Sequence, residues 1–327
     1  MKPRSKEGRT FDISAGERPK VLLLGNGIAR AFYETKSWNE LIEKIQDKNK
    51  FPLPAEQYKM PLPLKIDMLA NGHDFEHDKN FNYAMRRFED NDQSNTLINL
   101  LNLDFDYILT TNYTYEIEYA VKEDNQPFLY EDLEKYKLPT QDEENSIIKY
   151  HYQIPTNSKE YSIWHIHGEV LPKNHSIINH YEYGKLLSTY IRHFSSKKIN
   201  QPKVKIYTWL DAFILGDVYI VGFGMDFSEI DLWWLLEQKA INKKDKGIAV
   251  GTTTFFEPTE QTKDTKDTKN QKPPEVVDAN ECKKSLLEIY GVSVENLNFT
   301  VNDKEKDYPR FYQKVLNWLK EEFYKNA

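Results

Sequence analysis

The stretch Val-Leu-Leu-Leu-Gly-Asn-Gly at residues 21–27 is a short apolar run that ends in a turn with two glycines. This pattern is typical of a buried parallel strand followed by a tight turn. Such a turn can bring backbone N–H groups close to a pyrophosphate, with the N-terminus of the next helix facing it. A dehydrogenase fingerprint would have a third glycine where Arg30 stands, and a second strand where a helical pattern follows Gly27. The motif alone therefore leaves a purely structural turn open.

Four further apolar runs have the length and composition of buried strands; they lie at residues 107–109, 161–166, 218–221 and 248–250. Between and after them, apolar residues recur at intervals of three and four, which indicates amphipathic helices. Strands that alternate with helices predict an α/β protein. We expect a Rossmann-like, mostly parallel sheet with helices on both faces and an inserted helical module.

The remaining segments predict how the chain is organised around this sheet. Residues 1–19 are charged and poor in large apolar groups, so we expect a disordered tail. Residues 20–327 then form a single domain with helical insertions at about 35–104 and 121–160. Residues 257–275 contain Thr-Lys-Asp-type triplets, which predict a flexible surface loop.

Composition narrows the class of protein. The formal net charge is −7, so a basic excess for direct nucleic-acid binding is missing. Cys282 is the one cysteine, which leaves no disulfide framework within the chain and no multi-cysteine zinc module. The first residues lack the apolar segment of a signal peptide, and no apolar run reaches the roughly 18 residues of a membrane span. We therefore expect a soluble, cytoplasmic protein with no membrane contact.

Four of the predicted strands end in polar or glycine-bearing turns; these are Gly-Asn-Gly (25–27), Thr-Thr-Asn (110–112), His-Gly (167–168) and Gly-Phe-Gly (222–224). In a parallel sheet the carboxyl ends of the strands share one edge, and ligands bind there. The sequence therefore predicts a binding site built from these four turns.

Two side chains in these turns are candidates for catalysis. Asn112 can hold a ribose hydroxyl or a water in a fixed orientation, although it can equally cap the next helix. His167 stands at the strand end, where a neutral imidazole can accept a proton. His165 lies one pleat deeper, so we expect it to be a core histidine with a pKa that is lowered by burial. No third residue has the spacing of a metal ligand, so we predict no metal.

The fourth turn is followed by carboxylates with two possible uses. Asp226 can accept a hydrogen bond from a ribose hydroxyl; alternatively, the segment is a helix-entry loop in which Asp226 or Ser228 is the cap. Asp231 falls in the predicted first helical turn, where a carboxylate is favoured electrostatically.

The order and spacing of four motifs resemble the sirtuin-like domain of bacterial anti-phage proteins; they are Leu-Leu-Gly-Asn-Gly (23–27), Thr-Thr-Asn-Tyr (110–113), Ile-His-Gly (166–168) and Gly-Phe-Gly-Met-Asp-Phe-Ser-Glu-Ile-Asp (222–231). The likeness spans roughly residues 20–251, and the helix near 308–324 also fits. The resemblance implies a Rossmann-like domain that takes NAD as substrate, with Asn112 and His167 as its catalytic pair. It also implies that Gly25 and Gly27 lie by the phosphates of NAD. We expect the remaining residues that bind NAD to be Asn26, Thr111, Gly222, Gly224 and Asp226.

The resemblance also implies hydrolysis of NAD to nicotinamide and ADP-ribose, with depletion of the host's NAD stopping infection. Sirtuin deacylases carry a four-cysteine zinc module that this chain lacks, which disfavours protein deacylation. A zinc-free deacylase and a non-catalytic nucleotide-binding assembly module remain the alternatives. We further expect a homo-oligomer, triggered by a separate sensor or ATPase protein.

Overall fold

A computed structural model describes residues 9–33, 40, 60–70, 95–121, 133, 135–138, 146–149, 151–169, 176–196, 201–244, 248–260, 279–299 and 304–325. Its centre is an eight-stranded sheet in the order β10-β9-β8-β2-β3-β6-β5-β4. The six strands from β10 to β6 are parallel, whereas β5 and β4 pair antiparallel. The predicted Rossmann-like, mostly parallel sheet is therefore confirmed.

The strands of this sheet are β2 (Lys20–Leu24), β3 (Tyr107–Thr110), β4 (Lys137–Leu138), β5 (His151–Pro155), β6 (Glu160–His165), β8 (Asp217–Val221), β9 (Thr253–Glu260) and β10 (Ser293–Phe299). A small separate sheet pairs β1 (Thr10–Asp12) with β7 (Lys203–Lys205).

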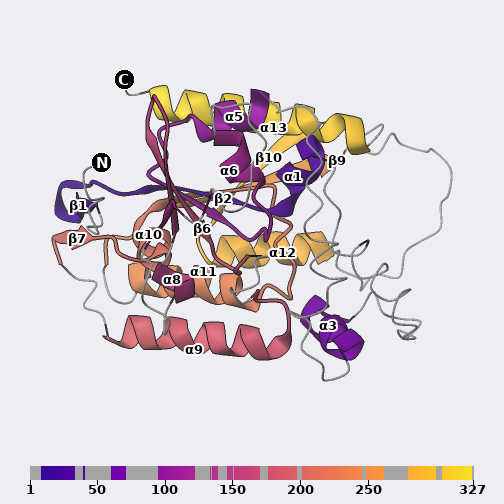
Figure 1. Ribbon diagram of the computed structural model, residues 1–327, viewed down its shortest axis with the longest axis horizontal. Helices are drawn as coiled ribbons and strands as arrows, with labels where there is room; N and C mark the ends of the chain where they lie inside the picture. The colour runs from indigo at the N-terminus through magenta and orange to yellow at the C-terminus, as the bar shows by residue number, and fades with distance from the viewer. Residues whose placement is uncertain are drawn as a thin grey trace.

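Helices cover both faces of the large sheet (Figure 1). On one face lie α1 (Asn26–Tyr33), α5 (Asn95–Leu101), α6 (Glu116–Val121) and α13 (Lys304–Tyr324). On the other lie α8 (Ser146–Lys149), α9 (His180–Ser196), α10 (Trp209–Leu215), α11 (Ile230–Lys244) and α12 (Ala279–Ile289). The 3-10 helix η1 (Ile13–Ala15) follows β1, and α3 (Leu62–Ala70) contacts α9.

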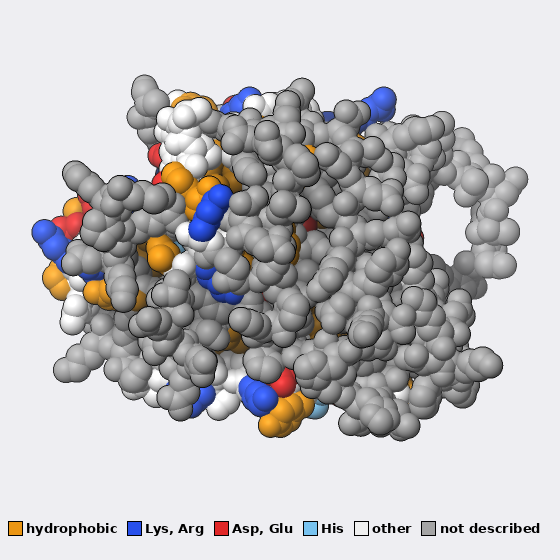
Figure 2. Space-filling view, in the orientation of Figure 1, with side chains coloured by type: hydrophobic (Ala, Val, Ile, Leu, Met, Phe, Trp, Pro, Cys, Tyr) orange, Lys and Arg blue, Asp and Glu red, His pale blue; other side chains and the backbone are white. Residues whose placement is uncertain are grey.

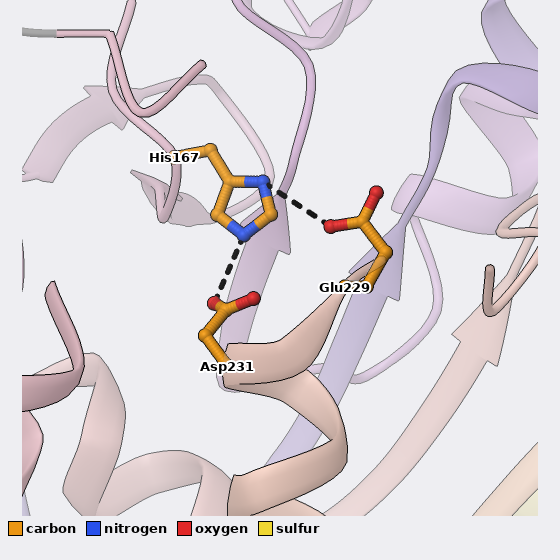
Figure 3. A group of neighbouring side chains, drawn as sticks. All are labelled: His167, Glu229 and Asp231. Carbon is orange, nitrogen blue, oxygen red and sulfur yellow. Dashed lines mark hydrogen bonds and ion pairs between the residues drawn. The ribbon is translucent and has the colours of Figure 1, made fainter. Parts of the chain in front are cut away.

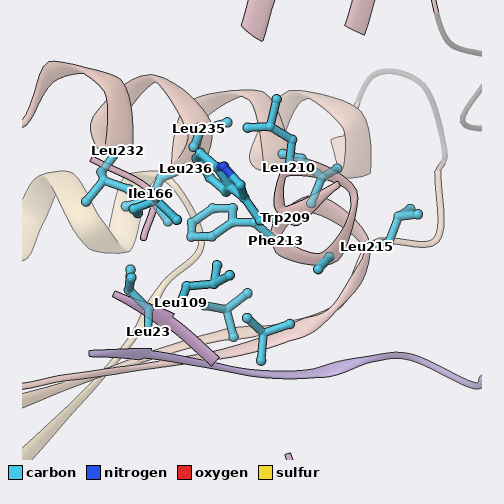
Figure 4. Packing of buried hydrophobic residues seen from close by; sticks show 14 of the residues in the cluster. Leu23, Leu109, Ile166, Trp209, Leu210, Phe213, Leu215, Leu232, Leu235 and Leu236 are labelled. Atoms are coloured by element: carbon cyan, nitrogen blue, oxygen red, sulfur yellow. The ribbon is translucent and has the colours of Figure 1, made fainter. Parts of the chain in front are cut away.

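The strand period of two divides the apolar side chains between two cores. Leu23 and Leu109 face α10 and α11, where they pack near Phe213, as Figure 4 shows. Leu22 and Leu24 point the opposite way, into the core formed with α13. Every second residue of a strand thus joins the same helical layer, which fixes the sheet between the two layers.

On the side of the molecule that Figure 2 views, the described Lys and Arg side chains lie in small groups among hydrophobic and acidic side chains. None of the helices within the described ranges combines the length and the apolar character needed to cross a membrane.

The expected disordered tail is wrong for residues 9–19. Phe11 and Ile13 are buried in the α10–α11 core, and β1 pairs with β7, so these residues are anchored. Residues 1–8 lie outside the described part.

The strand expected at 248–250 lies five residues later, as β9. Ile248 and Val250 are buried, but their N–H groups make local turn bonds to Asn242 and Ile248 rather than ladder bonds. An apolar run predicts burial, and these residues are buried, but burial does not require pairing with a neighbouring strand. The run alone therefore misplaced this strand. Because β9 continues to Glu260, residues 257–260 of the expected loop pair with β10, and residues 261–275 lie outside the described part.

The helical insertion expected at 121–160 contains two strands among its described residues, β4 and β5, with the short α8 before β5. Tyr152 and Ile154 alternate with less buried neighbours, which is the strand period. In the insertion expected at 35–104, the described helices are α3 and α5.

Candidate functional site

The four polar turns lie at one edge of the sheet, as predicted. Leu24 is in register with Thr110 on one side and with Val221 on the other, and Thr110 is in register with His165. The last residues of β8, β2, β3 and β6 therefore stand side by side. The chain passes from β2 to β3 and β6, then returns to β8 on the opposite side of β2. This reversal is the topological switch point at which open α/β sheets bind ligands.

The two glycine turns at the switch point pack against each other. Gly25 donates its N–H to Val221 O at 3.0 Å, and Gly27 donates to Gly222 O at 2.7 Å. A Cβ on Gly27 would stand 2.7 Å from the same oxygen, and Gly222 has a φ of +67°. Glycine is therefore required here for close backbone contact. The N–H groups of Gly25 and Gly27, which we expected to face a pyrophosphate, donate to protein carbonyls instead.

His167 follows β6 and is flanked by two carboxylates, as Figure 3 shows. Its Nε2–H donates to Asp231 Oδ2 at 3.0 Å, and its Nδ1 lies 3.9 Å from Glu229 Oε2. Helix α9 supports both carboxylates, because Tyr190 donates to Asp231 at 3.1 Å and Tyr183 donates to Glu229 at 3.0 Å. The tertiary fold therefore joins the end of β6 to the start of α11.

The carboxylates change the acid–base properties of this group. Burial opposes a charge on His167, but Asp231 and then Glu229 outweigh it, so the pKa of His167 is raised. Burial raises the pKa of Glu229 to about 7, against the opposing influence of His167. The sequence led us to expect a neutral imidazole at His167. Because its pKa is raised, the imidazole instead keeps its proton to higher pH.

The same three side chains have candidate metal-ligand atoms within 4.8 Å of one another. A metal ion binds a histidine through one nitrogen, whereas here the two carboxylates lie beside different nitrogens of the ring. The geometry favours proton chemistry.

Asn112 follows β3 and is buried. Its Nδ2 donates to the Glu116 carboxylate at the start of α6, and Thr114 donates to the same carboxylate at 2.6 Å. The backbone N–H of Asn112 donates to Thr110 Oγ1 at 3.1 Å. The amide nitrogen is therefore fixed by a side-chain acceptor.

His165 is a core histidine with both ring nitrogens satisfied, as expected. Its Nδ1–H donates to Asn112 O at 2.7 Å and its Nε2–H donates to Glu118 at 2.8 Å. The expected lowering of its pKa is wrong. Burial acts in that direction, but Glu118 and then Glu169 outweigh it and raise the pKa to about 9. A buried imidazolium thus holds the backbone of Asn112.

The loop after β8 has a fixed internal structure. Asp226 accepts hydrogen bonds from the Ser228 N–H at 2.8 Å and from its hydroxyl at 2.6 Å. Trp233 donates to the backbone oxygen of Asp226 at 2.9 Å, and Met225 has a positive φ of 48°. Asp226 thus forms an Asx turn in the loop that leads into α11; because α11 begins at Ile230, the side chain of Asp226 does not cap that helix, and its role toward a ribose stays a prediction.

A comparison with known protein families matches residues 106–273, just over half of the chain, to the SIR2-like domain. The chain belongs to the SIR2-like domain family. Its function is therefore related to NAD. The match includes the turns that carry Asn112 and His167 and the loop from Gly222 to Asp231, whereas β2 and its glycine turn precede it. No curated protein matches the sequence.

Sequence reasoning missed four residues of this SIR2-like site; they are Tyr183, Tyr190, Glu229 and Asp231. The sequence placed Asp231 in the first turn of a helix, where a carboxylate is favoured electrostatically. Asp231 does lie there, but it also bonds to His167. One signal was available, since Glu229 and Asp231 close the motif that begins at Gly222, on the predicted ligand edge. The two tyrosines lie on a helix with no such signal.

Proposed function

We propose that this SIR2-like protein is an NAD glycohydrolase, which cleaves NAD to nicotinamide and ADP-ribose. One arrangement carries the proposal. Asn112 and His167 each lie two residues beyond the registered pair Thr110 and His165, at the ligand edge of neighbouring strands. His167 is also bonded to Asp231, so an ionisable imidazole and a polar amide follow neighbouring strands at the same edge of the sheet.

In the proposed reaction the bond between ribose C1′ and the nicotinamide nitrogen breaks, and its electron pair leaves with nicotinamide. The transition state resembles an oxocarbenium ion, which water then attacks at C1′. Asn112 holds the ribose or the water, and His167 takes part in moving the proton that the water loses. NAD is the substrate, and its binding residues remain those proposed from the sequence: Gly25, Asn26, Gly27, Thr111, Gly222, Gly224 and Asp226.

We further propose that the reaction serves bacterial anti-phage defence. The likeness of the four motifs to anti-phage sirtuin-like domains supports this role. On this proposal a cytoplasmic homo-oligomer stays inactive until a separate sensor or ATPase protein triggers it, and the infected cell then loses its NAD.

The test measures nicotinamide and ADP-ribose released from NAD by the wild type and by Asn112→Ala, with purified protein and in phage-infected cells. Once triggered, the wild type should release both products, whereas Asn112→Ala should release neither while it remains folded. Turnover that requires an added acylated peptide would show a deacylase. NAD binding without turnover in either setting would show a binding module, and equal turnover by both proteins would remove Asn112 from the mechanism.

A further inference from the structure

Glu229 is the member of the His167 group that is best placed to meet a ligand. It stands at the ligand edge, immediately before α11, and its side chain is 15% exposed. The side chains of His167 and Asp231 are 3% and 0% exposed. As Figure 3 shows, Glu229 also lies at the ring nitrogen that Asp231 does not contact.

His167 is poorly suited to accept a proton in this setting. Its Nε2–H donates to Asp231, and its Nδ1 faces a second carboxylate at 3.9 Å. Two carboxylates around one imidazole favour the imidazolium, which has no lone pair left for a proton. A base is nevertheless needed, because a water that attacks C1′ must lose a proton.

We propose that Glu229 is the general base of the NAD hydrolysis proposed above, on which this inference rests, and that His167 positions it. In this step the ionised Glu229 carboxylate accepts one proton from the water as the water oxygen bonds to C1′. The glycosidic electron pair has left with nicotinamide, so the step yields ADP-ribose and a neutral Glu229 carboxyl. That carboxyl then releases its proton to solvent, which restores the starting state.

The surroundings of Glu229 suit a base that works near neutral pH. Burial raises its pKa to about 7, and Asp231 and Asp226 add to the rise, while His167 and the Tyr183 hydroxyl oppose it. Tyr113 and Tyr190 also face this group, and their own pKa values are raised by burial, so they stay neutral. A base must be ionised, so turnover should fall as pH drops through about 7.

The first experiment follows NAD turnover against pH for the wild type, Glu229→Gln and Glu229→Asp. Glu237→Gln is the matched control, since it removes a charge from the same helix α11 outside the site. We expect Glu229→Gln to lose at least about a hundredfold in kcat and to lose the acidic limb of the profile. Glu229→Asp should regain part of the rate together with that limb. A wild-type rate and profile in Glu229→Gln would overturn the assignment.

The second experiment does not depend on turnover. Infrared spectra of the free protein should show a carboxyl C=O band that appears as pH falls through about 7. This band should persist in Glu237→Gln and disappear in Glu229→Gln. Its absence from the wild type would overturn the proposal for Glu229 even if NAD is cleaved. If the band is present but no NAD is cleaved, the proposed function fails, and this inference fails with it.

Discussion

His165 and His167 lie one pleat apart, yet they stand in two different electrostatic settings. Around His165 the buried charges balance, because His165 and Lys137 face Glu118 and Glu169. Tyr115 and Tyr152 donate further hydrogen bonds to Glu169. Around His167 the charges do not balance, since one imidazole stands between two carboxylates.

This difference distinguishes a cluster that supports the structure from a cluster suited to catalysis. A cluster of balanced, mutually bonded charges resists change and holds its neighbours, here the backbone of Asn112. An excess of carboxylate perturbs pKa values and favours positive charge nearby, which is typical of functional sites. An oxocarbenium-like transition state is such a charge, so we expect catalysis at the unbalanced cluster.

The largest effect should come from exchanging the two histidines in turn for alanine. His167→Ala should lower NAD turnover about a hundredfold or more, because the proposed base Glu229 loses the group that positions it. It should also lower the melting temperature less than His165→Ala, since Tyr190 still bonds to Asp231. Turnover and melting are measured side by side. If His165→Ala stops turnover at unchanged stability while His167→Ala stays active, the two roles must be reversed.

The next effect concerns Glu118, the partner of His165. Glu118→Gln leaves a buried imidazolium without its carboxylate, which should cost about 3–5 kcal/mol of unfolding free energy. Chemical denaturation measures this loss. Glu182→Gln serves as control, because the partner Lys185 is 54% exposed and such a pair contributes about 0–1 kcal/mol. Equal losses in both variants would show that the His165 cluster is not a special support.

A pH effect of somewhat smaller size follows from the pKa of His165. That pKa rises from 6.5 to about 9 on folding, so the folded state binds the proton more tightly than the unfolded state. The resulting stabilisation, roughly 3 kcal/mol, is fully present below pH 6.5 and is lost as pH rises through about 9. Wild-type stability should fall over that window more than the stability of Glu118→Gln. Parallel curves would contradict the buried imidazolium.

The smallest effects come from one tyrosine in each cluster. Tyr190→Phe removes a hydrogen bond to Asp231, and Tyr152→Phe removes one to Glu169. Each should cost roughly 1.5–3 kcal/mol of stability, because both acceptors are charged. Only Tyr190→Phe should also change turnover and its pH profile. A similar change in both would mean that the two clusters act as one.

The sequence by itself determined the central strands of the sheet and their ligand edge. Apolar runs such as residues 21–24 and 218–221 were sufficient, because a strand buried on both faces needs little more than continuous apolar side chains. The polar residues that follow, Asn112 and His167 among them, were predictable because parallel strands share one carboxyl edge.

Tertiary structure alone decided the charge state of the site. The pairing of His167 with Asp231, and of His165 with Glu118, joins residues 64 and 47 positions apart, so no local spacing reveals it. The pKa of each histidine was misjudged for the same reason. Burial can be inferred from a strand pattern, but the nearby carboxylate that outweighs burial is placed by helix packing.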